Sequence, residues 1–114
     1  MNKENRLKVY NKFSGRCAYC GKEIEYKDMQ VDHIKPKYQG GTDDIDNLFP
    51  ACRLCNHYKR ACSPQVYKEW NLSTLIDKLR KIYIFRVAER YGMVEVKKWD
   101  KKFYYERQMK GGEK

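Results

Sequence analysis

Four of the five cysteines in this chain form two short pairs, and this spacing constrains the fold more than any other feature. The pairs are Cys17-Ala-Tyr-Cys20 and Cys52-Arg-Leu-Cys55. Two residues between thiols allow both sulfurs to reach one tetrahedral ion, so two such pairs predict a four-thiolate zinc site. A redox pair would explain one of the pairs but not both, and buried free thiols are the other alternative. Cys62 lies outside both pairs, and we interpret it as a small buried apolar residue.

The chain has 114 residues, so its hydrophobic core must be small and a metal staple would help it to fold. An aromatic content of 14% argues against intrinsic disorder. The longest run of large apolar residues, 82–85, is far too short to cross a membrane. The N-terminus lacks the apolar segment of a secretory signal, and we therefore expect a cytoplasmic protein with reduced thiols.

The net charge of +10 indicates a polyanionic partner, with nucleic acid as the leading candidate and a merely lysine-rich surface as the alternative. Residues 1–62 carry 12 basic and 8 acidic side chains, and residues 63–114 carry 13 and 7. Four thiolates and one Zn²⁺ would lower the charge of the first segment to about +2. We therefore expect most of the attraction for DNA to come from residues 63–114.

Hydrophobic spacing predicts a small α+β core within residues 1–62. Apolar residues recur every three positions over 5–13 and predict a helix that ends at Gly15. Loose alternation over 24–34 predicts a strand or hairpin, 48–50 a second short strand, and 53–61 a helix. Residues 63–114 form the second predicted domain, a mainly helical extension that contacts DNA or forms a homodimer.

The extension begins with Ser63-Pro64, a favourable helix start, and its helical spacing continues to Tyr91, with Gly92 as the C-cap. Beyond that point Val94 and Val96, then Phe103 and Tyr105, alternate with period two, which predicts a terminal β-hairpin.

The segment between the cysteine pairs and just beyond it carries side chains suited to phosphodiester hydrolysis. Such a reaction needs a base for water, a cation to offset phosphate charge, and a group that positions both. His33 can serve as the base, while Asp32 and Asn56 offer hard oxygen ligands to an ion such as Mg²⁺. Each residue alone has a plainer interpretation as a surface histidine, a turn aspartate or a solvated amide.

The order and spacing of these residues resemble the HNH endonucleases, a family with a ββα-metal core. The resemblance covers about residues 13–62 and comprises the two cysteine pairs, Val31-Asp32-His33-Ile34-x-Pro36, Gly40-Gly41, Asp46-Asn47-Leu48 and Asn56-x-x-Lys59.

The resemblance implies that His33 is the general base and that Asp32 and Asn56 hold one catalytic Mg²⁺ or Mn²⁺, the four cysteines holding a structural Zn²⁺. It also implies that Asn47 braces the loop rather than touching the metal. A neutral amide at position 56, where other members carry histidine, favours Mg²⁺ over Zn²⁺.

Basic side chains near this segment are candidates to contact phosphate. Lys59 and Arg60 lie three and four residues after Asn56 and would share its helical face. Lys35 and Lys37 flank the His33 loop, and we expect His57 to contact solvent or phosphate. A solvated helix end is the alternative for these positions.

These features together predict a metal-dependent endonuclease that hydrolyses DNA, with duplex DNA as the expected substrate. A zinc-stabilised DNA-binding module without catalysis and a ribonuclease with the same core remain as alternatives.

Overall fold

The structure, a computed structural model, describes residues 1–111 and divides into two compact units. Unit 1 comprises Met1–Pro64 together with the segment that begins at Lys102, and unit 2 comprises Gln65–Lys101. We expected one boundary near residue 62. The chain instead divides at Pro64 and again at Lys102, so that its C-terminal segment returns to unit 1.

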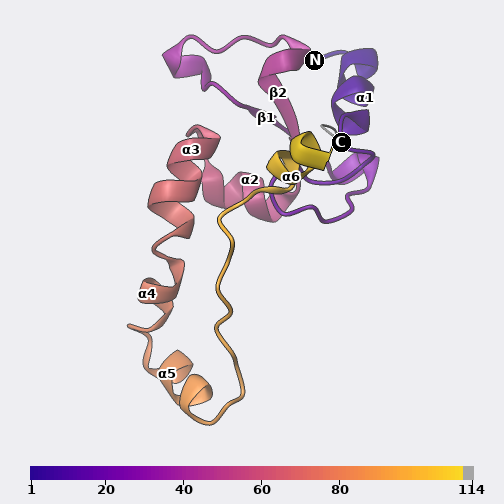
Figure 1. Cartoon of the computed structure of the whole chain (residues 1–114). Helices are drawn as coiled ribbons and strands as arrows, with labels where there is room; N and C mark the ends of the chain where they lie inside the picture. The colour runs from indigo at the N-terminus through magenta and orange to yellow at the C-terminus, as the bar shows by residue number, and fades with distance from the viewer. Residues whose placement is uncertain (112–114) are drawn as a thin grey trace. The chain divides into compact units, whose positions relative to one another are not determined.

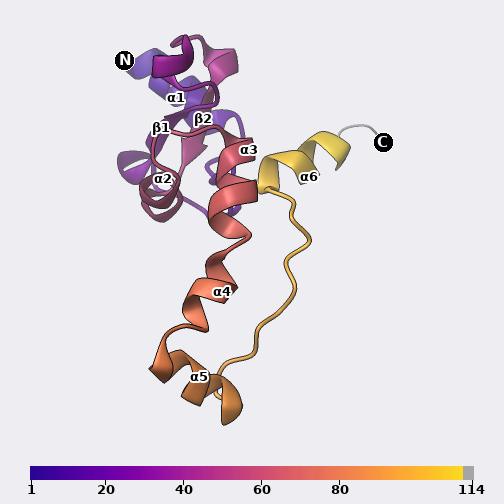
Figure 2. The same cartoon turned by 90° about the vertical axis from the view of Figure 1, so that its left-hand side faces the viewer.

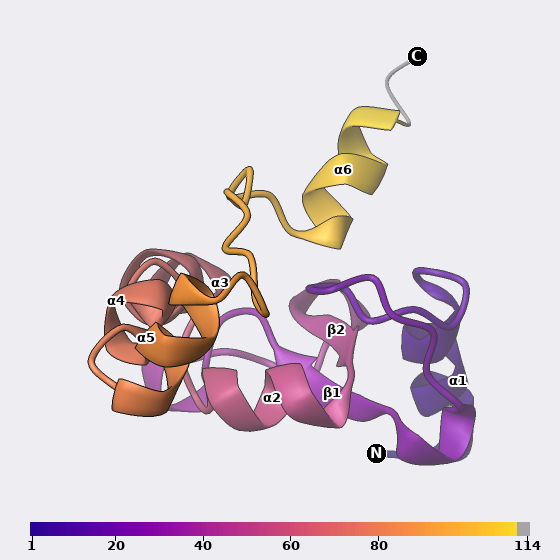
Figure 3. The ribbon, with the colours of Figure 1, turned by 90° about the horizontal axis from the view of Figure 1, so that it is seen from below.

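Unit 1 is built on a two-stranded antiparallel sheet flanked by helices. Strand β1 (Gln30–His33) pairs with β2 (Leu48–Ala51), so that Asp32 lies opposite Phe49 and His33 opposite Leu48. Helix α2 (Arg53–Lys59) follows β2 and packs against β1, whereas α1 (Lys3–Asn11) packs against β2 (Figures 1 and 3). Short 3-10 turns at Tyr26–Asp28, Lys37–Gln39 and Ile45–Asn47 occupy the connections. The α+β class and the strand, strand, helix order expected from the sequence are confirmed.

Helix α1 begins two residues earlier than its apolar spacing predicts because Asn2 caps it. The Asn2 side chain accepts a hydrogen bond of 2.7 Å from the backbone N–H of Asn5, which satisfies one free donor of the first turn. Gly15 follows the helix with a φ of +80°, and its N–H donates to the carbonyl of Tyr10. Val9 is the side chain that the helix buries.

The core of unit 1 is an aromatic cluster centred on Tyr19 and Phe49. The ring of Tyr19 lies 5.9 Å from that of Phe49 and 5.1 Å from that of Phe103, in edge-to-face arrangements that aromatic quadrupoles favour. Tyr105 adds a further ring at 4.7 Å from Phe49. Segments from the start, the middle and the end of the chain therefore meet in one core.

The β-hairpin expected over residues 94–105 is wrong. Residues 93–103 have no regular secondary structure, and helix α6 (Tyr104–Gly111) follows them. The Glu106 side chain accepts from the backbone N–H of Phe103 at 2.9 Å, as the glutamate of a capping box does. The alternating aromatics mark an anchored helix start, since Phe103 and Tyr105 both contact Tyr19.

Unit 2 is helical, as the sequence predicts. Helix α3 (Pro64–Val66) continues into a π-helical segment (Tyr67–Leu72), and α4 (Leu75–Leu79) and α5 (Tyr83–Arg90) follow in order (Figure 2). Gly92, with a φ of +73°, ends α5 as expected of a C-cap glycine. Within residues 1–111, no helix is both long enough and apolar enough to span a membrane.

Candidate metal and catalytic site

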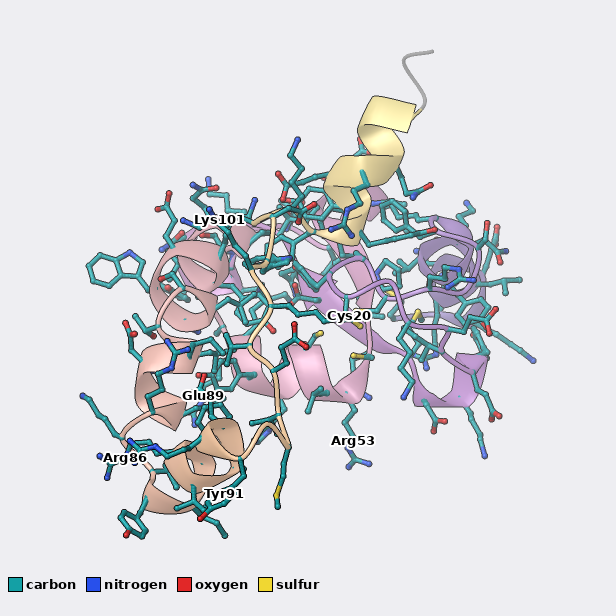
Figure 4. All side chains as sticks on the ribbon, turned by 60° about the horizontal axis from the view of Figure 1, so that its bottom comes forward. Cys20, Arg53, Arg86, Glu89, Tyr91 and Lys101 are labelled. Carbon is teal, nitrogen blue, oxygen red and sulfur yellow. The ribbon has the colours of Figure 1, made fainter. Side chains whose placement is uncertain are left out.

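The four paired cysteines meet at one point of unit 1. Their sulfur atoms all lie within 4.8 Å of one another, and the Sγ atoms of Cys20 and Cys52 are 3.8 Å apart. Tetrahedral zinc with Zn–S bonds of about 2.3 Å requires a sulfur–sulfur separation of about 3.8 Å. Cys20, labelled in Figure 4, is exposed, and its three companions are buried. The cluster therefore fits a structural zinc ion.

Local backbone geometry shapes both cysteine pairs. The first pair closes as a turn, because the N–H of Gly21 donates to the Cys17 carbonyl at 3.0 Å. Cys52 is the N-cap of α2, and its sulfur accepts from the N–H of Cys55 at 3.4 Å. Hydrogen bonds from the thiols of Cys17 and Cys55 lower the pKa of Cys20 to about 3. The cluster thus stabilises a thiolate, the form that binds metal.

Asp32 lies in β1 with its carboxylate buried. Only 5% of the residue is exposed, and the carboxylate accepts a hydrogen bond from the hydroxyl of Tyr19. The ammonium of Lys59 lies 3.0 Å from both carboxylate oxygens. Burial raises the pKa of Asp32, while the hydrogen bond from Tyr19 and the charge of Lys59 oppose that rise. Burial and the neighbouring Asp32 charge raise the pKa of Tyr19, so its hydroxyl remains a donor.

His33 is the last residue of β1, and its ring is only partly exposed. Its Nε2 lies 2.7 Å from Oδ1 of Asp43, and Lys37 reaches Oδ2 of the same carboxylate at 3.2 Å. Hydrogen bonds from His33 and Lys37 lower the pKa of Asp43, so this carboxylate is ionised and can only accept. Nε2–H of His33 therefore donates in this contact, and whenever the ring is neutral its acceptor nitrogen is Nδ1.

Asn47 holds the loop that follows β1. Its Oδ1 accepts from the N–H of Lys35 at 2.8 Å, and its Nδ2 donates to the carbonyls of Lys35 and Thr42. Gly41 packs so closely that an added Cβ would overlap the Lys35 carbonyl. These contacts fix the position of Asp43, two residues after Gly41.

Asp32, His33 and Asn56 line one open cavity of about 290 Å³. β1 contributes the first two, and α2 contributes Asn56 together with Lys59. Asp43 does not line this cavity but lines a neighbouring one that His33 also lines. The imidazole therefore lies between the candidate metal ligands and its acidic partner.

The basic side chains divide between surface and interior. Lys35, Lys37 and Arg60 are exposed, as is His57, and Lys37 and Arg60 line the cavity of the candidate ligands. Lys59 differs from the surface position that we expected, because it is only 1% exposed and its ammonium contacts Asp32 and the carbonyl of Cys62. It serves as the counter-charge of Asp32 in this structure.

Sequence reasoning missed two residues of the site. Tyr19 lies between Cys17 and Cys20, where its contact with Asp32 depends on how the first cysteine pair folds against β1. Asp43 follows the Gly40-Gly41 pair, and its distance from His33 depends on the loop geometry. The available signal for Asp43 was its place as an acidic residue two positions after a glycine pair that itself follows the candidate base.

This site defines a class of protein, a small core with a four-cysteine cluster that presents an Asp-His pair and an asparagine at one cavity. Residues 17–61 match the family model described as HNH endonuclease.

Two curated relatives also match. A CRISPR-associated endonuclease Cas9 from Corynebacterium diphtheriae is 42% identical over 45 residues, which cover 39% of this chain and 4% of that protein. The SPbeta prophage-derived putative HNH endonuclease YoqL of Bacillus subtilis is 30% identical over 107 residues, covering 84% of this chain and 40% of that protein.

The crystal structure of the Type II-C Cas9 enzyme from Actinomyces naeslundii matches with a TM-score of 0.53 and 31% sequence identity. The match covers 58% of this chain and 7% of that chain. The segment of residues 17–61 is therefore similar to the HNH endonucleases. The chain spans less than half the length of each of these relatives.

Proposed function

We propose that this protein is a metal-dependent endonuclease that hydrolyses phosphodiester bonds of DNA. The observation that carries the proposal is the shared cavity lined by Asp32, His33 and Asn56. These three supply an anionic oxygen, a nitrogen base and an amide oxygen within one site. The match of the same segment to the HNH endonucleases supports this choice of reaction class.

Asp32 and Asn56 are the residues that would hold the catalytic ion, Mg²⁺ or Mn²⁺. The fit rests on their donor atoms, because one carboxylate and one amide oxygen suit a hard cation that keeps water and phosphate oxygens as further ligands. A carboxylate has about four acceptor positions. Asp32 can therefore bind an ion while its carboxylate also contacts Tyr19 and Lys59. When bound, the ion would offset the charge that develops on the phosphate and the leaving oxygen.

His33 acts as the general base in this proposal. Asp43 accepts from Nε2–H, and this orients the ring and leaves Nδ1 to take the proton of the attacking water. Asp43 then stabilises the imidazolium that forms, as the acidic partner of a catalytic histidine does.

DNA as the substrate is supported by charge. The chain carries a net charge of +10, and Lys37 and Arg60 border the cavity with exposed cationic side chains. Such contacts would bind the backbone rather than the bases, so they position the substrate without selecting a sequence.

A panel of substrates tests the proposal. Supercoiled plasmid, single-stranded DNA and RNA are incubated with the zinc-loaded protein in Mg²⁺, in Mn²⁺ or in EDTA. We expect nicked or linear plasmid in both metals and intact plasmid in EDTA. Cleavage of RNA alone would contradict the choice of substrate, and binding of DNA without any cleavage would contradict the choice of enzyme.

A further inference from the structure

Two side chains contact the carboxylate of Asp32, and each lies within or beside one of the two cysteine pairs. Tyr19 lies between Cys17 and Cys20, and its hydroxyl donates to Oδ2 of Asp32. Lys59 lies four residues after Cys55 on α2, and its ammonium lies 3.0 Å from both oxygens. A residue next to each cysteine pair therefore contacts Asp32, the candidate ligand of the catalytic ion.

Packing restricts the side chains of both Tyr19 and Lys59. Tyr19 is 3% exposed, and its ring makes edge-to-face contacts with Phe49 and Phe103. Lys59 is 1% exposed, and its ammonium lies 5.9 Å from the centre of the Tyr19 ring. Because neither side chain has room to turn elsewhere, the position of Asp32 depends on where the two cysteine pairs stand relative to each other.

We propose that Tyr19 is a positioning residue through which the four-cysteine zinc site sets the affinity of Asp32 for a divalent cation. The proposal rests on the proposed function, in which Asp32 and Asn56 hold the catalytic ion. Zinc joins the first pair to the second and so holds the Tyr19 hydroxyl at Oδ2 of Asp32. Partners of metal ligands fix the orientation of those ligands, and losing one weakens metal affinity by about 10-fold to 100-fold.

Coupling between the two sites must be reciprocal. If zinc in the cysteine site strengthens divalent binding at Asp32, a bound divalent ion must strengthen zinc retention by the same factor. In the proposal the Tyr19 hydroxyl transmits this coupling. Its removal should therefore weaken both the effect of zinc on divalent binding and the effect of the divalent ion on zinc retention.

Tyr19→Phe removes only the hydroxyl and keeps the ring in the aromatic cluster. Tyr105→Phe is the matched control, because it removes a hydroxyl from the same cluster, and Tyr105 makes no hydrogen bond to Asp32 among the described residues. The zinc content and the melting temperature of both variants are measured first. The affinity for Mn²⁺ alone is then measured by electron paramagnetic resonance on the full zinc-loaded chain.

We expect Tyr19→Phe to retain one zinc per chain and to bind Mn²⁺ at least about tenfold more weakly than wild type. Tyr105→Phe should bind Mn²⁺ within about twofold of wild type. Equal Mn²⁺ affinity of Tyr19→Phe and wild type would overturn the proposal. Asp32→Asn tests the underlying function separately, because wild-type Mn²⁺ affinity in that variant would reject Asp32 as the ligand.

A second measurement on the wild-type chain keeps the test valid if Tyr19→Phe does not fold. The affinity for Zn²⁺ is measured at equilibrium, by competition with a chromophoric zinc chelator, with and without saturating Mn²⁺. Reciprocal coupling predicts a Zn²⁺ affinity that is several-fold higher in Mn²⁺. An unchanged affinity would contradict the coupling.

Discussion

Two loop side chains, Asp43 and Asn47, determine the surroundings of His33. Asn47 joins the backbone of Lys35 to that of Thr42, and this closes the loop that carries Asp43. Asp43 then contacts Nε2 of His33 at 2.7 Å. The chemistry proposed for the histidine therefore depends on a residue outside the motif that identifies it.

Asp43→Ala should lower kcat by about tenfold with little change in KM, since general-base catalysis as a whole contributes about 10²–10⁴. The ring of His33 would lose the acceptor that fixes its tautomer. Nitrogen NMR of the imidazoles checks this independently of activity, and His57 serves as an internal reference because the chain has 2 histidines. Neutral His33 should carry its proton on Nε2 in wild type and on a mixture of nitrogens in the variant.

Asp44→Ala is the control, because Asp44 lies in the same exposed loop and contacts Thr42 rather than the histidine. A loss of kcat in both variants would indicate a general effect of the loop. A wild-type kcat and tautomer in Asp43→Ala would remove Asp43 from the mechanism.

The candidate ligands could be predicted from sequence because their spacing encodes them, whereas their supporting residues could not. Two residues between cysteines already define a metal site, and Asp32-His33 at a strand end defines an acid next to a base. The roles of Tyr19 and Asp43 depend on contacts across 13 and 10 residues of sequence, which only the folded chain creates.

At the scale of elements, α2 and β1 meet through a buried ion pair. Helical spacing predicted that Lys59 shares the face of Asn56, and both do line the same cavity. Spacing does not say which face a neighbouring strand covers. β1 brings the buried charge of Asp32 to this face, so Lys59 is turned inward to compensate it.

Lys59→Met should lower the free energy of unfolding by about 3–5 kcal/mol at neutral pH, because it leaves Asp32 as an uncompensated buried charge. Burial already raises the pKa of Asp32 above its ordinary value. The loss of stability caused by the buried Asp32 charge is therefore present above that raised pKa. It is relieved as the pH falls through that pKa and Asp32 becomes protonated. Denaturant unfolding at several pH values checks both the size and the trend.

Lys27→Met is the matched control, since its side chain is 76% exposed and should change stability by less than about 0.5 kcal/mol. A Lys59→Met variant as stable as this control would contradict the buried pair. A loss of stability in Lys59→Met that grows toward acid pH would contradict the expected protonation of Asp32.

At the scale of the whole molecule, the C-terminal segment completes the core formed by the first half of the chain. Phe103 is 2% exposed, and the N–H groups of Tyr104 and Tyr105 donate to the carbonyls of Tyr19 and Ala18. Period-two alternation suggested a hairpin here because aromatic spacing cannot distinguish a strand from an anchored helix start. Truncation after the cysteine pairs would therefore remove part of the core as well as positive charge.

Phe103→Ala should lower the free energy of unfolding of the zinc-loaded chain by about 3–5 kcal/mol, the usual cost of a large aromatic cavity. Tyr91→Ala is the control, because Tyr91 is 75% exposed at the end of α5 (Figure 4). Thermal and denaturant melting compare the two variants. Equal stabilities would show that the C-terminal segment does not belong to the core.

Cleavage of supercoiled plasmid by His33→Ala tests the central claim most directly. The variant is compared with wild type in Mg²⁺ and in Mn²⁺, after its zinc content and melting temperature have been shown to be unchanged. We predict that removal of the base lowers the cleavage rate by at least about 10²-fold in both metals. A cleavage rate close to that of wild type, with zinc and fold intact, would contradict the assignment of His33 as the catalytic base.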